Sequence, residues 1–225
     1  MATASLHINK LSAAKRQIQA AIRMFFHPED ELAVHTVGAA AYELLRDIKN
    51  SRGMSEAADV HLASIFYVVR DFHRGALPLH IVNDPSAMGE VSRLVALLSP
   101  ISADSKLSDV RAAISSKFEK EYWDIVHRVP NFLKHADRDG NATLAADAVN
   151  NQLLLLQCCN AYRDVAPDDL GNEGFMFQIF VTADNDAYQP DASSFGSLVA
   201  SVRKLSHDRR VKLCSESIKE LNVGA

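Results

Sequence analysis

The fold of this chain is decided first by residues 29–53, which read EDELAVHTVGAAAYELLRDIKNSRG. Apolar residues recur in this stretch every three or four positions: Val34, Val37, Ala41, Leu44, Leu45 and Ile48. That spacing places them along one face of an α-helix. Pro28, just before the stretch, suits the first turn of a helix, and Gly53 is a typical residue at the end of one. We therefore predict one long amphipathic helix that contributes a single face to a core.

The same helical period recurs along the rest of the chain. Further helices are predicted at 6–26, 55–75, 84–100, 144–163, 195–205 and 208–221, and one begins near residue 108 and includes Val126. Thr143 is expected to cap the helix at 144–163. The run GFMFQIFV (174–181) is compatible with a helix or a strand, because the periodicity of a short apolar run does not distinguish the two.

Composition agrees with a helical protein. The chain has 225 residues, of which 48% are hydrophobic and 23% charged, with only nine glycines and seven prolines. The share of glycine plus proline lies well below the average of roughly 12%, and this favours long uninterrupted helices. No repeat, low-complexity tract or linker is evident. We expect one all-α domain over residues 1–225, a helical bundle of about eight or nine helices.

The net charge and the cysteine content limit the expected binding partners and the expected cellular compartment. The net charge of −4 means that no global basic field attracts nucleic acid, so that any RNA contact has to be local. Cys158, Cys159 and Cys214 are too few for a disulfide framework and are expected to be small core residues in a reducing cytoplasm. No stretch is long and apolar enough for a membrane span, and no signal peptide is evident. The absence of acidic residues before Glu29 is also typical of an organellar transit peptide, although a first core helix explains the same pattern.

The main chemical candidates lie in the segment HRVPNFLKHADRDGN, residues 127–141. On a helix, Asn131, His135 and Arg138 have the spacing i, i+4, i+7 and share one face, with Arg128 and Lys134 close by. A neutral imidazole can take a proton from a ribose 2′-hydroxyl, and guanidinium groups can hold the phosphate. A solvent-facing amphipathic helix has the same spacing, so both interpretations stay open.

The same segment resembles the HEPN superfamily (higher eukaryotes and prokaryotes nucleotide-binding). Arg128-Val-Pro-Asn131-Phe-Leu-Lys134-His135 is similar to the family motif of an Arg and a His separated by four to six residues, with a polar residue between them. Residues 33–53 are similar to the early helix of some relatives. The resemblance implies a small helical domain, often dimeric, that is a metal-independent ribonuclease or a binding module related to one.

The resemblance also implies roles for individual residues. Arg128 corresponds to the motif arginine, Asn131 to the intervening polar residue and His135 to the motif histidine. The catalytic set is then Arg128, Asn131, His135 and Arg138, with Lys134 binding substrate. Pro130 is expected to break the helix, which leaves open whether Arg128 or Arg138 pairs with His135. The implied partners are RNA or a nucleotide, a second copy of the chain and an antitoxin-like protein, with no cofactor.

Two alternatives come from other classes of protein. One is a non-catalytic helical protein that binds a partner or a ligand. The other is a metal-centred bundle, because Glu121, Asp124 and His127 have helical spacing, and further ligands could come from His35, Glu43, His61 and His73. No HExxH motif occurs, so no metal site is predicted. His35 is expected to be a half-buried, hydrogen-bonded histidine. The chain also lacks the P-loop, Rossmann and nucleophile-elbow motifs.

Overall fold

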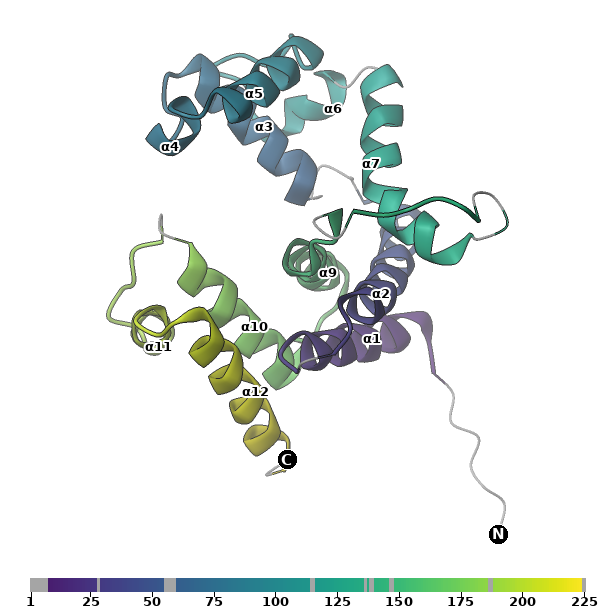
Figure 1. Cartoon of the computed structure of the whole chain (residues 1–225), viewed down its shortest axis with the longest axis vertical. Coiled ribbons are helices and arrows are strands. Elements are labelled where there is room, and N and C mark those ends of the chain that lie inside the picture. Colours follow the sequence, from purple (N-terminus) through teal and green to yellow (C-terminus); the bar gives the residue numbers. More distant parts are fainter. Residues whose placement is uncertain are drawn as a thin grey trace. The chain divides into compact units, whose positions relative to one another are not determined.

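The computed structural model (Figure 1) describes residues 8–27, 29–54, 60–113, 116–135, 137, 140–145, 148–185 and 188–223. About 74% of these residues are helical, none lies in a strand, and nine of their helices have ten or more residues. The prediction of an all-α helical protein is therefore confirmed. The chain divides into two compact units, Met1–Arg52 with Asn141–Ala225 (unit 1) and Gly53–Gly140 (unit 2). The predicted single domain over residues 1–225 stays a prediction.

The described residues of unit 1 form six α-helices. They are α1 (Lys10–Phe25), α2 (Glu31–Ser51), α9 (Asn151–Val165), α10 (Gly171–Asp184), α11 (Ser194–Arg203) and α12 (His207–Val223). Helix α2 packs against both α1 and α9, and α10 packs against α11 and α12 (Figure 1). Four of these helices start after a side chain that accepts from the first turn: Asn9 before α1, Asp30 before α2, Asn150 before α9 and Ser193 before α11.

Small residues bring α2 close to α9. A Cβ atom on Gly38 would lie 3.0 Å from Cδ2 of Leu154, which is tighter than ordinary van der Waals contact. The Sγ of Cys158 donates to the carbonyl of Gly38 at 3.3 Å. All three cysteines, including Cys159 and Cys214, are buried free thiols, as predicted for core residues.

A cluster of phenylalanines joins α1 to α10. The ring centroids of Phe25 and Phe26 lie 5.2–6.3 Å from those of Phe177 and Phe180, mostly in edge-to-face geometry. The run 174–181, for which the sequence leaves helix and strand open, is part of helix α10. Met176, Phe177, Ile179 and Phe180 are buried there, so tertiary packing decides the conformation that the period leaves ambiguous.

Unit 2 has its own core. Its elements are α3 (Val60–His73), α4 (Leu79–Val82), α5 (Pro85–Leu97), the 3₁₀ turn η2 (Leu107–Asp109), α6 (Val110–Ala113) and α7 (Ser116–Lys134). Phe66, Val69, Leu98, Ile101 and Val110 are at most 1% exposed and form the centre of that core. Asp84 caps α5 and Pro85 is its first residue, as the sequence predicts.

Two predicted boundaries are wrong. Helix α9 begins at Asn151, not at residue 144, and Thr143 is an exposed residue outside any helix. The helix predicted from about residue 6 begins at Lys10, because Asn9 is extended and caps α1 there. Helix α7, which contains Val126, extends to Lys134. The expected helix start near residue 55 and the role of Pro28 lie outside the described residues. Among the described helices, none combines the length and the apolarity needed to cross a membrane.

Candidate functional site

The candidate residues Arg128, Asn131 and Lys134 lie at the carboxyl end of α7, and Pro130 is inside the same helix. A proline within a helix removes one hydrogen-bond donor and costs about 3 kcal/mol. Val129 is only 6% exposed and Pro130 is also buried, so the burial of apolar surface offsets part of that cost. The expected break at Pro130 is therefore wrong, and α7 is continuous from Arg128 to Lys134.

The continuous helix aligns three of the candidate residues. The backbone N–H of His135 donates to the carbonyl of Asn131 at 3.0 Å, which extends the helical turn past Lys134. Seven residues of helix separate the Cα atoms of Arg128 and His135 by about 10 Å along one face. Arg128, Asn131 and Lys134 are all exposed, so their side chains are accessible to a ligand that lies along this face.

His135 has an acidic neighbour that no sequence motif indicates. Its Nδ1 atom lies 3.9 Å from Oδ1 of Asp137, and the two side chains are 36% and 79% exposed. This separation is too long for a hydrogen bond, so the interaction is electrostatic. A carboxylate on this side favours the tautomer with the proton on Nδ1, and Nε2 then keeps a free lone pair. Arg138, the other candidate phosphate ligand, lies outside the described residues.

The side chains considered as metal ligands differ from one another in their surroundings. Asp124 is exposed on α7, His127 is half-buried, and the side chains of Glu121 and His61 lie outside the described part of the chain. His35 is buried and hydrogen-bonded to Asn151 at 3.1 Å between Nδ1 and Oδ1. Within the described ranges, no group of three or more His, Cys, Asp or Glu side chains is arranged to hold a metal ion.

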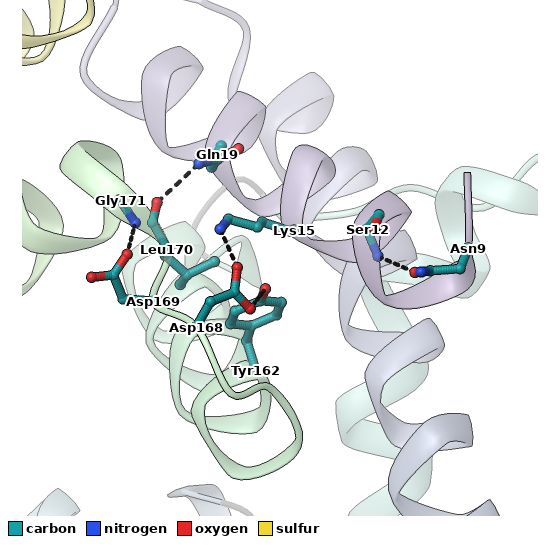
Figure 2. A network of polar contacts seen from close by, with 9 residues as sticks. All are labelled: Asn9, Ser12, Lys15, Gln19, Tyr162, Asp168, Asp169, Leu170 and Gly171. Carbon is teal, nitrogen blue, oxygen red and sulfur yellow. Dashed lines mark hydrogen bonds and ion pairs between the residues drawn. The ribbon is translucent and has the colours of Figure 1, made fainter. Parts of the chain in front are cut away.

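Unit 1 contains a second arrangement of polar groups, around the loop between α9 and α10. Figure 2 shows Lys15 of α1 and Tyr162 of α9 converging on the carboxylate of Asp168. Lys15 Nζ lies 2.5 Å from Oδ2, and the hydroxyl of Tyr162 donates to Oδ1 at 2.9 Å. The side chain of Gln19 donates to the carbonyl of Leu170 at 3.0 Å. These contacts tie the loop to α1 at two points.

The same loop lines a pocket of about 440 Å³ between α9 and α10. Most of its wall is apolar or uncharged: Leu156, Cys159, Tyr162, Leu170, Gly171, Gly174, Phe175 and Phe177. Three charged residues also line the pocket, Arg163 on α9 and Asp168 and Asp169 in the loop. All three are exposed to solvent. An apolar pocket with a few convergent polar groups has the general form of a small-molecule site.

Three of the clearly shifted pKa values belong to residues that line this pocket. Burial raises the pKa of the Cys159 thiol to about 12, so this thiol is neutral near pH 7. Burial, followed by the hydrogen bond to Asp168, raises the pKa of Tyr162. The hydrogen bonds from Lys15 and Tyr162 lower the pKa of Asp168, which is therefore ionised and satisfied by two donors.

Local sequence patterns do not predict this pocket. Lys15 and Asp168 are separated by 153 positions, and neither belongs to a recognisable motif. The local signal is limited to Pro167 and Gly171, which predict a turn between two apolar helices.

Comparison with known proteins finds no match: no family model, no curated protein and no solved structure is similar to this chain. The resemblance of residues 128–135 to the HEPN motif therefore stays a prediction.

Proposed function

We propose that this chain is a HEPN-like, metal-independent RNA endonuclease whose active site is the polar face of α7. The observation that supports the proposal most is the continuity of α7 through Pro130. A helix broken there would leave the relative positions of Arg128 and His135 undefined. The continuous helix gives Arg128, Asn131 and His135 a shared, solvent-accessible face.

In the proposed reaction His135 is the general base. Its Nε2 takes the proton from a ribose 2′-hydroxyl, and the 2′-oxygen attacks the adjacent phosphorus. The bond from phosphorus to the 5′-oxygen breaks, and that oxygen takes a proton from solvent. The products are a 2′,3′-cyclic phosphate and a 5′-hydroxyl end. The carboxylate of Asp137, 3.9 Å from Nδ1, favours the tautomer that this step needs.

The other residues of the face bind and orient the RNA. The guanidinium group of Arg128 stabilises the charge that develops on the phosphate oxygens, and Arg138 is the alternative for this role. Asn131 orients the reacting phosphate, and Lys134 contacts a neighbouring one. Because each protomer supplies few catalytic groups, we propose a homodimer in which a two-fold axis brings two such sets into one cleft. An antitoxin-like protein that covers the face is the corresponding regulatory partner.

The test is RNA cleavage by the full chain and by His135→Ala. We expect the substitution to reduce cleavage by about 10²–10⁴-fold, the usual contribution of a general acid–base group. His73 is also an exposed histidine of unit 2, so His73→Ala is the matched control and should leave cleavage unchanged. Arg128→Gln should reduce cleavage. Arg209→Gln, which replaces an exposed arginine of α12, should leave cleavage unchanged.

Two further measurements separate a direct catalytic role of His135 from metal-assisted hydrolysis and from loss of folding. Cleavage should persist in EDTA, because no metal ion takes part in the proposed reaction. The thermal stability of His135→Ala should match that of the unmodified chain, since a solvent-accessible side chain has little packing energy. Cleavage that is lost in EDTA, or that His135→Ala leaves intact, would contradict the proposal.

A further inference from the structure

The pocket between α9 and α10 has the dimensions of a ligand site, and specific contacts hold the loop that lines it. Its volume of about 440 Å³ lies within the range of roughly 300–1,000 Å³ that is usual for small-molecule pockets. Position 174 has to be glycine, because a Cβ atom there would lie 2.4 Å from Cβ of Leu170. The contacts of Lys15 with Asp168 and of Gln19 with Leu170 fix the loop that lines the pocket to α1 (Figure 2). A pocket that is already ordered requires little ordering of the protein on binding.

Arg163 supplies a cation at the edge of this pocket. Arg163 is exposed, and its Nη2 donates to Oε1 of Gln178 at 2.8 Å. A guanidinium group has five N–H donors, and within the described residues Arg163 has no carboxylate partner. The two acids of the pocket already have partners: Asp168 accepts from Lys15 and Tyr162, and Asp169 accepts from the backbone N–H of Gly171.

We propose that this pocket binds a small molecule with an apolar body and a single carboxylate, the carboxylate on Arg163 and the body between α9 and α10. Leu156 and Phe177 supply apolar wall on opposite helices. A guanidinium group pairs well with a carboxylate because two parallel N–H···O bonds can form. The neutral thiol of Cys159 adds to the wall without repelling an anion. This site is separate from the polar face of α7 and does not depend on the proposed nuclease activity.

The probe is octanoate, titrated into the full chain labelled with nitrogen-15 and followed by NMR, with octanamide as its uncharged counterpart. We expect saturable shifts at the side-chain amide of Gln178 and at the backbone amide of Gly174. Octanamide should bind about tenfold more weakly, because it cannot form the charge-assisted pair.

Three variants assign the contacts. Arg163→Gln should weaken octanoate binding about tenfold and leave octanamide binding unchanged. Arg209→Gln removes an exposed arginine of α12 that does not line the pocket, and it should have no effect. Cys159→Met adds volume to the pocket wall and should weaken both probes together.

Three outcomes would overturn the proposal. The first is an absence of saturable shifts at Gln178 and Gly174. The second is equal affinity for octanoate and octanamide, with no effect of Arg163→Gln. The third is a dimer, seen by sedimentation, that dissociates on Phe175→Asp. Phe175 is 47% exposed at the pocket edge, so this result would identify a second copy of the chain as the occupant.

Discussion

At the scale of single residues, His35 shows how burial changes the pKa of a side chain. It lies in α2, is 7% exposed, and its Nδ1 is 3.1 Å from Oδ1 of Asn151, whose side-chain amide donates to the carbonyl of Glu31 at 2.9 Å. The expected hydrogen bond is confirmed, whereas the ring is buried and not half-buried as the sequence predicts. Burial lowers its pKa from the ordinary 6.5, and the hydrogen bond with Asn151 opposes this shift only in part.

This shift predicts a pH dependence of stability. Between pH 6.5 and the lower pKa of the folded state, the unfolded chain binds more protons at His35 than the folded chain does. The free energy of unfolding should therefore fall as the pH falls below 6.5, by at most about 1.4 kcal/mol per pH unit from this group. Urea unfolding over a pH series measures the slope. His35→Gln should reduce it, whereas His73→Gln, at an exposed position, should not; equal slopes in all three proteins would contradict this prediction.

At the scale of an element, the start of α9 depends on one side chain. Asn150 precedes the helix, and its Oδ1 accepts from the backbone N–H of Leu153 at 2.9 Å. Thr143 has a suitable side chain for a cap and precedes an apolar run, so the sequence favours an earlier start at residue 144. The structure places Thr143 outside any helix, and the apolar face of α9 that packs on α2 begins after Asn150.

Replacing each of these two residues distinguishes the two starts. Asn150→Ala should lower the free energy of unfolding by about 1 kcal/mol, because an N–H group at the start of α9 loses its partner. Thr143→Ala should change it by less than about 0.5 kcal/mol, as expected for an exposed residue away from a cap. Chemical unfolding followed by circular dichroism measures both values, and the reverse order would restore the earlier start.

At the scale of the whole molecule, each of the two units has a buried phenylalanine at its centre. Phe66 of unit 2 is fully buried, and Phe177 of unit 1 is 1% exposed. The sequence predicts that residues 1–225 form one domain, and a single domain unfolds in one cooperative transition. The chain has one tryptophan, Trp123 in α7 of unit 2, so its fluorescence follows that unit, whereas circular dichroism follows all helices.

We expect Phe177→Leu and Phe66→Leu each to lower stability by about 1–3 kcal/mol. For one cooperative domain, Phe177→Leu should shift the Trp123 fluorescence transition as far as the dichroism transition, although Phe177 belongs to the other unit. Two separate transitions, with fluorescence sensitive to Phe66→Leu alone, would show that the units unfold independently.

The sequence by itself determined the helical class and the positions of most helices. Apolar spacing, Asp30 and Asp84 at helix starts, and the Gly53 turn all act over a few residues, and this is why α2, α5, α11 and α12 agree closely with their predicted ranges. The spacing of Arg128, Asn131 and His135 is likewise local, so the candidate face on α7 follows from sequence once the helix is known to continue.

Only the tertiary structure decided the features that depend on distant parts of the chain. Pro130 remains inside α7 because it is buried there, and residues 174–181 are helical because their apolar side chains pack against other helices. The pocket beside Arg163 needs Lys15 to lie against Asp168, 153 positions away in the sequence. Such contacts come from packing between elements, and local periodicity does not encode them.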